Sequence, residues 1–413
     1  MNNLAEELRT RGLIEHEGGG KAADFLKDKR TVYLGMDPTA DSLHVGHLVP
    51  LIVMKHLANA GHELVFLVGG GTGMIGDPRE SGERKLLDAK TLALNTKALH
   101  KQLTRILGKK YRIVDNYDWL KKLGMIEFLR DVGKNFTVNQ LIKRDIIKRR
   151  LDTEEDAISY TEFSYSLLQA YDFLHLYTKY GVDLQIGGSD QWANIVSGVD
   201  LIRRRAQGSA YALTTPIIED AKTGKKFGKS EGNAVWLSAE KTSAYDFYQF
   251  WLTVPDESVE KYLKIFTFLS FAEIDTTMSA QRGRPQDREG QKTLAFEVTK
   301  MIHGEEEGSA VQKVSGILFG DTPFSQLGKD DLRLIARSIS PVPVSEGMLV
   351  ADALALGGIA DSKTDARRLI EGKAVSLNDA LVETIDRTLL RNDFRNNYAF
   401  LCRGKKIALL RRE

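Results

Sequence analysis

The chain has 413 residues, of which 42% are hydrophobic and 28% are charged. These values are typical of a soluble globular protein with two or three domains. Its 58 basic and 56 acidic residues leave a formal net charge of only +2. A nucleic-acid partner must therefore be met by local basic patches and not by an overall field.

The single cysteine, Cys402, excludes an internal disulfide and a cysteine-based zinc site. This suits a reducing cytoplasm, and the sequence contains no visible metal-binding cluster. The N-terminus has no apolar signal core, and no apolar run approaches the ~20 residues needed to cross a bilayer. We expect a soluble, untargeted, cytoplasmic protein with no protein-held metal and no membrane partner.

The first elements of the chain predict a strand, a turn and a helix. Residues 1–30 look helical, and the glycines at 18–20 end that pattern. Residues 31–34 then alternate as a β-strand, residues 35–41 supply turn residues, and the apolar run at 43–57 predicts a helix.

Two histidines, His44 and His47, stand where this helix begins. They are three residues apart and therefore share one face. The unpaired N–H groups and the dipole of a helix N-terminus attract anions, phosphate above all. The pattern indicates a phosphate site, although two histidines can also simply satisfy a buried helix start.

A glycine-rich run at residues 69–78 follows a second predicted strand at 64–68. Strands that alternate with helices predict a parallel sheet with right-handed crossovers. Ligands bind such sheets at the carboxyl ends of the strands. The glycine spacing does not match the dinucleotide fingerprint, so we interpret this run as a place of close backbone approach.

Residues 85–150 are predicted to be rich in helix, with another short strand at 111–114. Basic residues at the end of this stretch, Arg150 included, would share a helical face, and a second basic run follows at 203–205. Most such runs are only solvated helix faces; in an RNA-handling protein they contact phosphates. The candidates are Lys143, Arg144, Lys148, Arg149, Arg203 and Arg204.

The predicted helix at 161–180 carries a polar stripe of Tyr165, Gln169 and Asp172, at spacings of i, i+4 and i+7. A polar stripe on a mostly apolar helix faces water or lines a pocket. The next stretch, residues 184–192, predicts a buried strand that ends in a glycine turn with an acid and an amide. Polar groups at the carboxyl end of a strand belong to ligand sites more often than to cores.

Residues 226–230, Lys-Phe-Gly-Lys-Ser, follow a polar segment that is predicted to be a loop. The glycine gives flexibility between lysines that can close on a polyphosphate. Taken alone, a basic loop is usually solvated surface.

The remainder of the chain predicts helices at 238–335, a linker around 340–343 and a small basic module. An aromatic cluster at 245–251 is interpreted as core. The module has predicted helices at 347–356 and 363–371, followed by strands at 374–377 and 398–410. Its candidate RNA contacts are Arg367, Arg368, Arg403, Lys405 and Lys406.

The His-x-Gly-His helix start and the later Lys-x-x-Lys-Ser segment together resemble the paired nucleotide-binding motifs of class I aminoacyl-tRNA synthetases. The segments TEFSYSLLQAYDF, LQIGGSDQW and DNYDW are similar to bacterial-type tyrosyl-tRNA synthetases. The terminal module resembles an RNA-binding domain first described in a ribosomal small-subunit protein, and the resemblance covers nearly the whole chain.

This resemblance implies an α/β protein with a Rossmann-like parallel-sheet catalytic domain, an α-helical domain and a small α+β RNA-binding module. The expected boundaries are residues 1–235 with a helical insertion at about 85–150, residues 236–335, a linker at 336–345, and residues 346–413.

The resemblance also implies roles for single residues of an ATP-dependent tyrosine–tRNA ligase. The tyrosine site comprises Tyr33 and Asp172 on the phenolic hydroxyl, Asp77, Tyr165 and Gln169 on the α-ammonium group, and Gln185. The ATP site comprises Asp37, Gly46, Gly188, Asp190, Gln191 and Lys229. The expected catalytic residues are Thr39 and His44, which would donate to the γ-phosphate end, His47, which would lie near the ribose, and Lys226, Lys229 and Ser230, which would close over the pyrophosphate.

The implied partners are tyrosine, tRNA(Tyr), ATP with Mg2+ bound through its phosphates, and a second copy of the chain. The sequence departs from the family pattern in the loop at 79–84, which lacks a lysine that related chains often carry. Arg79 or Arg84 is a candidate replacement. Phe227 stands where many class I enzymes have methionine, as in other tyrosyl enzymes.

Two alternatives remain at this point. One is an enzyme that activates tryptophan or transfers a nucleotide, and the other is a non-catalytic RNA-binding protein derived from a synthetase. Neither enzyme alternative predicts Tyr33 together with Asp172 or a terminal RNA module, and an eroded synthetase would have lost its site residues.

Overall fold

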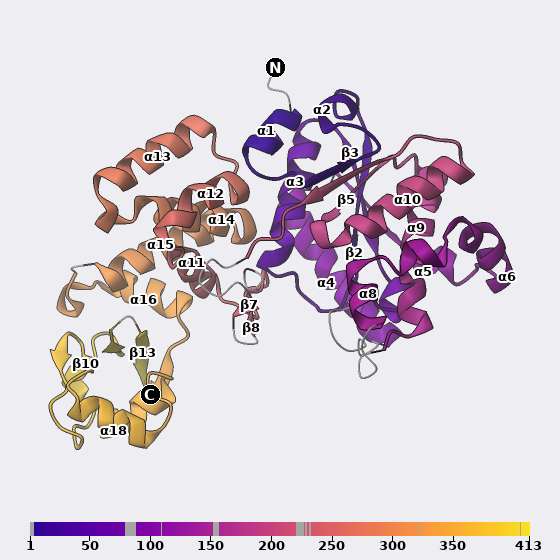
Figure 1. Cartoon of the computed structure of the whole chain (residues 1–413). Helices are drawn as coiled ribbons and strands as arrows, with labels where there is room; N and C mark the ends of the chain where they lie inside the picture. Colours follow the sequence, from indigo (N-terminus) through magenta and orange to yellow (C-terminus); the bar gives the residue numbers. More distant parts are fainter. Residues whose placement is uncertain are drawn as a thin grey trace. The chain divides into compact units, whose positions relative to one another are not determined.

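The computed structural model describes residues 4–78, 88–108, 110–151, 157–219, 227, 229–230, 233–320, 322–404 and 406–413. The chain divides into two compact units (Figure 1). Unit 1 comprises residues 1–238 and 255–290, and unit 2 comprises residues 239–254 and 291–413. No described helix is both long enough and apolar enough to span a bilayer.

Unit 1 is built on a six-stranded sheet in the order β1-β6-β5-β2-β3-β4. All neighbouring strands are parallel except the antiparallel edge pair of β1 and β6. The strands are β1 (His16–Gly18), β2 (Thr31–Met36), β3 (Glu63–Val68), β4 (Arg112–Asp115), β5 (Leu184–Gly188) and β6 (Tyr211–Thr215). The predicted parallel sheet is confirmed.

Helices lie on the sheet because its central strands β2, β3 and β5 are mostly buried and need cover on both faces. Helix α3 packs against β2, β3, β5 and β6. On the face of the sheet that packs against α9 and α10, the core includes Tyr33 of β2 and the alternate residues Val65 and Leu67 of β3. The larger helices are α1 (Leu4–Thr10), α3 (Leu48–Asn59), α4 (Ala89–Leu107), α8 (Asp145–Leu151), α9 (Tyr160–Tyr180), α10 (Trp192–Arg205), α12 (Asp256–Phe266) and α13 (Phe271–Gly283).

Shorter elements complete unit 1: α2 (Ala22–Phe25), α5 (Tyr117–Leu120), α6 (Met125–Glu127), α7 (Val138–Leu141), β7 (Lys229–Ser230) and β8 (Asn233–Ala234). The helical prediction for residues 1–30 is wrong in part. His16–Gly18 forms β1, because the exposed edge of β6 offers it backbone partners.

Helix α9 is defined at both ends by local sequence signals. Ser159 and Glu162 form a reciprocal capping box at its start, and Gly181 ends it with a left-handed φ of 68°. Glu162 is also paired with Arg150 at 2.7 Å, and both side chains are 3% exposed. Arg150 therefore lies inside the unit and does not belong to a basic surface.

Unit 1 continues past the boundary expected at residue 235, through helices α12 and α13. The guanidinium of Arg11 donates to the carbonyls of Lys264, Thr267 and Leu269 at the end of α12. These bonds satisfy carbonyls that a helix end leaves unpaired, and so fasten α12 to the N-terminal segment.

Unit 2 contains the remaining helices and a five-stranded sheet in the order β11-β10-β12-β13-β9. Its elements are α11 (Ala244–Leu252), α14 (Glu289–His303), α15 (Glu305–Phe319), α16 (Lys329–Ser338), β9 (Val342–Val344), α17 (Val350–Leu356), α18 (Lys363–Glu371), β10 (Ser376–Leu377), β11 (Ala380–Leu381), β12 (Tyr398–Arg403) and β13 (Lys406–Arg412). The aromatic cluster of α11 is core as predicted, since Phe247, Tyr248 and Trp251 are buried.

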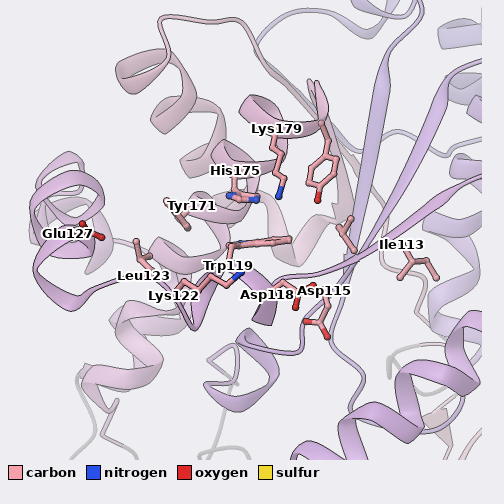
Figure 2. Close-up of a pocket in the computed structure, with 12 residues that line it drawn as sticks. Ile113, Asp115, Asp118, Trp119, Lys122, Leu123, Glu127, Tyr171, His175 and Lys179 are labelled. Atoms are coloured by element: carbon pink, nitrogen blue, oxygen red, sulfur yellow. The ribbon is translucent and has the colours of Figure 1, made fainter.

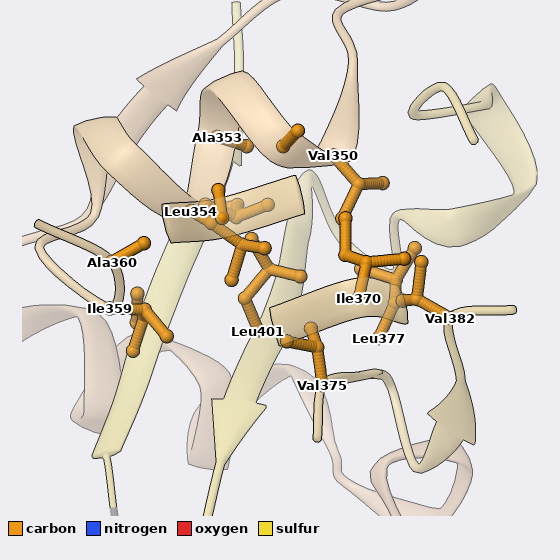
Figure 3. Packing of buried hydrophobic residues seen from close by; sticks show 14 of the residues in the cluster. Val350, Ala353, Leu354, Ile359, Ala360, Ile370, Val375, Leu377, Val382 and Leu401 are labelled. Carbon is orange, nitrogen blue, oxygen red and sulfur yellow. The ribbon is translucent and has the colours of Figure 1, made fainter. Parts of the chain in front are cut away.

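The terminal module has its own apolar core between α17, α18 and one face of this sheet, including Leu354, Ile370 and Leu401 (Figure 3). The other face packs Phe400 and Leu409 against Leu332 and Ile335 of α16. The expected linker at 336–345 contains β9, which pairs in parallel with β13. The segment that joins the helices to the module is therefore part of the module's sheet.

Candidate functional site

A cavity of about 1000 Å3 opens in unit 1, where the carboxyl ends of β2, β3 and β5 meet. It brings together residues that are far apart in the sequence. The predicted site residues that line it are Tyr33, Asp37, Thr39, His44, Gly46, His47, Asp77, Tyr165, Gln169, Asp172, Gln185, Gly188, Asp190 and Gln191.

The buried part of the cavity holds Tyr33 and Asp172, which are 0% and 1% exposed. The Asp172 carboxylate accepts hydrogen bonds from Asn116 Nδ2 at 2.8 Å and from Trp119 Nε1 at 2.7 Å. Burial raises the pKa of Asp172 to about 7, against the effect of these two donors, and Asp37 and Asp115 raise it further. Burial and the nearby Asp172 charge raise the pKa of Tyr33 well above its usual value.

Two polar atoms that line this part of the cavity have no hydrogen-bond partner among the described residues. They are the Tyr33 hydroxyl and the Gln185 side-chain oxygen. A buried polar atom without a partner costs about 1–3 kcal/mol, so both atoms favour a ligand that supplies the missing bonds. A hydroxyl donor beside a carboxylate acceptor is complementary to a phenol.

Asn116 and Trp119 were not predicted as site residues, although the segment that contains them carries part of the family resemblance. Asn116 also accepts from the Gly71 amide at 2.7 Å and donates to Thr72 Oγ1 at 2.9 Å. It thereby ties the glycine run to Asp172. The position of these residues just after β4, at a strand's carboxyl end, is the one sequence signal that points to them.

Two further acids of the cavity are held by neighbouring polar side chains. Asp37 accepts from Thr72 Oγ1 at 3.1 Å and from the Tyr165 hydroxyl at 3.3 Å. A β-carbon added at Gly69 would lie 1.9 Å from Asp37 Oδ1, so glycine is required there. This is the close backbone approach that the sequence analysis inferred for the glycine run.

Asp77 accepts from Gln191 Nε2 at 2.8 Å and from Asn194 Nδ2 at 3.3 Å. Gln191, which the family resemblance placed with the ATP site, is thus bonded to an acid that the same resemblance placed with the tyrosine site. Asn194 was not identified from the sequence, and it also donates to Gln191 Oε1 at 3.1 Å. The arrangement gives Asp77 a fixed orientation with amide neighbours.

The two histidines form a reciprocal cap at η1 (Val45–His47), the short helix before α3. Gly46 N donates to His44 Nδ1 at 3.1 Å, and His44 N donates to His47 Nδ1 at 3.2 Å. When neutral, each ring therefore carries its proton on Nε2, because Nδ1 accepts from a backbone amide. A β-carbon at Gly46 would meet His44 Cε1 at 2.8 Å, so only glycine allows this placement.

The segment after the predicted lysine loop runs beside these histidines. β7 pairs with β8, and residues just beyond pair with the histidine segment through Val45 N to Val235 O at 2.9 Å and Leu237 N to Leu43 O at 2.8 Å. Phe227, the centre of the second motif, is buried against Tyr262 and Phe266 of α12. The two predicted motifs are therefore adjacent in unit 1.

Several predicted residues cannot be placed at this site. Lys226, Arg79 and Arg84 lie outside the described residues, as does Lys405 in unit 2, and the description of Lys229 and Ser230 is limited to their backbone pairing in β7.

Most of the candidate RNA-binding side chains are exposed, namely Lys143, Lys148, Arg149, Arg203, Arg204, Arg367, Arg368 and Lys406. Arg403 is partly buried. Arg144 instead turns toward α10, where its guanidinium donates to Asn194 Oδ1 at 2.8 Å and to Ser197 Oγ at 2.7 Å. Arg144 thus orients Asn194, which in turn donates to Asp77. A contact of Arg144 with RNA stays a prediction.

The parallel sheet, the paired histidines at its first helix start and the second motif beside them define a class I synthetase site. The family model of class I tRNA synthetases for tryptophan and tyrosine matches residues 26–320. The C-terminal domain model of SYY-like tyrosine–tRNA ligases matches residues 334–410.

Full-length relatives agree with these matches. The tyrosine–tRNA ligase of Laribacter hongkongensis is 44% identical over 99% of this chain and 98% of its own. That of Bifidobacterium longum is 45% identical over 98% of this chain and 96% of its own. The structure of a C-terminally truncated mitochondrial tyrosyl-tRNA synthetase from Aspergillus nidulans superposes with a TM-score of 0.69 at 32% identity, covering 77% of this chain and 95% of that one. The chain therefore belongs to the class I tRNA synthetases of the tryptophan and tyrosine family, and within it to the tyrosine–tRNA ligases.

Proposed function

We propose that the cavity of unit 1 carries out the first half of the tyrosine–tRNA ligase reaction, and that the basic residues of the chain hold tRNA for the second half. In the first half, a tyrosine carboxylate oxygen attacks the α-phosphorus of ATP. The bond from that phosphorus to the bridging oxygen breaks, and pyrophosphate leaves with the electron pair. No covalent bond to the protein is needed, so catalysis consists of positioning and charge stabilisation.

The observation that carries the proposal is that Tyr33 and Asp172 line the same cavity as the two histidines. The substrate phenol donates to the Asp172 carboxylate and accepts from the Tyr33 hydroxyl. The Tyr33 hydroxyl thereby gains the hydrogen-bond partner that it lacks among the described residues of the free protein. Phenylalanine would leave the Tyr33 hydroxyl without a partner and would not supply the further hydrogen bond that Asp172 can accept. Asp77, Tyr165 and Gln169 hold the ammonium group, since a carboxylate with neutral acceptors complements it.

We assign the Nε2–H group of His44 to the phosphates, together with Thr39 and the lysine segment, and we assign His47 to the neighbourhood of the ribose. The Nδ1 atoms of both histidines are occupied by backbone amides, so the donor direction is fixed before ATP binds. Fixed donors aimed at developing charge are an effective form of transition-state stabilisation. Asp37, Gly188 and Asp190 are assigned to the adenosine.

Mg2+ belongs to this proposal as an ion that ATP brings on its phosphates. Among the described residues there is no group of three or more His, Cys, Asp or Glu side chains that could hold a metal ion. When bound, Mg2+ neutralises phosphate charge, and the protein's own donors then act on the remaining oxygens.

In the second half, a hydroxyl of the terminal tRNA ribose attacks the tyrosyl carbonyl carbon and AMP leaves. We assign the tRNA to exposed basic residues, because phosphate contacts dominate such affinities. In unit 2 these include Arg367 and Lys406. A cytoplasmic location, where tRNA and ATP are available, completes this part of the proposal.

A homodimer is also part of the proposal. Large apolar side chains are exposed on the helical segments between β4 and the start of α9, including Ile126 at 75%, Tyr160 at 70% and Val138 at 60%. Exposed apolar groups of this kind mark interaction surfaces. Ile126→Asp and Tyr160→Asp should shift the mass measured by light scattering from two copies to one, whereas an unchanged mass would place the dimer contact elsewhere or remove it.

Tyrosine-dependent exchange of labelled pyrophosphate into ATP tests the first half. We expect exchange with tyrosine and background rates with tryptophan or phenylalanine. Exchange that depends on tryptophan, or none with any amino acid, would overturn the proposal.

Substitutions in the module test the second half better than its deletion. Removing residues 346–413 would strip Phe400 and Leu409 from the core that they share with α16. The double substitution Arg367→Ala, Lys406→Ala should instead raise the KM for tRNA and leave pyrophosphate exchange unchanged. Lys292→Ala, an exposed lysine on α14, is the matched control. If the wild type, the double variant and the control all charge tRNA equally well, the module does not bind tRNA.

A further inference from the structure

A second cavity of about 820 Å3 is lined by residues of β4, α5 and α9, and one of its lining residues is bonded to Asp172 of the tyrosine site. This residue is Trp119, which lines the second cavity and donates its indole N–H to Asp172 Oδ1 at 2.7 Å. Figure 2 shows the ring of His175 lying over the ring of Trp119 in this cavity. The two ring centroids are 4.3 Å apart, with 14° between the planes.

His175 is one helical turn after Asp172 on α9, so the two residues approach Trp119 from neighbouring positions of one helix. The rings of Tyr171 and Tyr180 lie 6.3 and 6.4 Å from the His175 ring. The Nε2 atom of His175 is buried without a hydrogen-bond partner among the described residues. Burial and the nearby Lys179 lower the pKa of His175, and both therefore favour the neutral ring. These contacts are those of a ring that stacks, and not of a charged group that pairs.

The second cavity gives Trp119 space to move. Without the His175 ring, one face of the indole borders that cavity, and a rotation into it breaks the bond to Asp172. We propose that His175 is a positioning residue for tyrosine recognition, which acts by holding Trp119 against Asp172. The inference rests on the proposed function, since it concerns the same phenol site.

The test separates stacking from mere space filling by two substitutions of similar bulk. His175→Phe keeps a planar ring against Trp119, whereas His175→Leu fills the space without one. A stacked aromatic pair contributes enough for a threefold to tenfold effect. We expect His175→Leu to raise the KM for tyrosine in pyrophosphate exchange about threefold to tenfold with kcat and the KM for ATP unchanged, and His175→Phe to restore the wild-type KM. Lys122→Ala, an exposed lysine that lines the same cavity, is the matched control.

A double-mutant cycle locates the effect. In a Trp119→Phe background, which has no indole N–H, His175→Leu should cause no further rise in the KM for tyrosine. If His175→Leu behaves like wild type, or raises the KM by the same factor in both backgrounds, the inference is wrong. A wild-type chain without tyrosine-dependent exchange would instead contradict the proposed function, so the two failures are distinguishable.

Discussion

The buried and the exposed parts of the cavity are ordered by different means. In the buried part, side chains fix one another: Asp172 is held by Asn116 and Trp119, all within an apolar core. In the exposed part, backbone amides fix His44 and His47 through their Nδ1 atoms. Selecting a phenol requires desolvated polar groups that lose their partners with the wrong ligand, whereas phosphate transfer requires donors that remain reachable by a charged substrate. Mutations should therefore impair one part of the cavity without impairing the other.

The largest effect is expected from Asp172→Ala. It removes a charge-assisted acceptor and leaves Asn116 and Trp119 without their bonds, so kcat/KM for tyrosine should fall roughly 100- to 1000-fold. Steady-state pyrophosphate exchange measures this value. Asp118→Ala, a nearby exposed carboxylate, should stay within about twofold of wild type. A loss of similar size in Asp118→Ala would contradict the assignment.

His44→Ala should affect only the exposed part of the cavity, where the two histidines lie. Removing one donor to the developing phosphate charge should lower kcat about 100-fold and leave the KM for tyrosine nearly unchanged. Gly46→Ala sharpens the test. Its added β-carbon would lie 2.8 Å from His44 Cε1, so the His44 ring would be displaced but would still be present. A raised KM for tyrosine in either variant would show that the two parts are coupled.

Stability should depend on pH through Asp172. Its pKa is about 7 in the fold against 3.8 for an ordinary aspartate, so the folded state binds more protons than the unfolded state between these values. The free energy of unfolding attributable to this group therefore falls as pH rises from 4 to 7. Asp172→Asn should be more stable than wild type at pH 8 by on the order of 2 kcal/mol, and this advantage should disappear near pH 4. Urea unfolding at both pH values measures it.

The pH profile of tyrosine use should report the same carboxylate. An ionised Asp172 accepts the phenol's hydrogen bond, so kcat/KM for tyrosine should rise between pH 6 and 8 with an apparent pKa of about 7. Trp119→Phe removes a donor that lowers this pKa, and should move the midpoint upward by about one unit. A midpoint that moves downward would show that Trp119 does not stabilise the charge.

The smallest effect is expected from Tyr33→Phe. The Tyr33 hydroxyl is buried without a described partner in the free protein, so removing it should leave the free energy of unfolding unchanged or raise it by up to about 1 kcal/mol. The preference for tyrosine over phenylalanine should fall about tenfold, as measured by exchange with each amino acid. Marked destabilisation would mean that the hydroxyl has a structural partner.

The sequence predicted the parts of the site whose signals are local. The helix start at His44 and the stripe of Tyr165, Gln169 and Asp172 follow from capping and helical spacing, and the structure places them in one cavity. The roles of Asn116 and Trp119 depend on β4 lying beside β3 at the sheet edge, which no local pattern encodes.

Tertiary context also decides the predictions that differ from the structure. Periodicity placed Arg150 on a helix but could not tell that its face meets Glu162. The sequence around Pro343 has the composition of a linker, yet it forms an edge strand because β13 offers a parallel partner and an edge position tolerates proline.

Equilibrium binding of labelled tyrosine without ATP is the most direct test of separability. Dialysis should give the same Kd for wild type and His44→Ala, and a Kd at least 100-fold weaker for Asp172→Ala. Equal binding by the Asp172→Ala and wild-type chains, or lost binding in His44→Ala, would contradict the account.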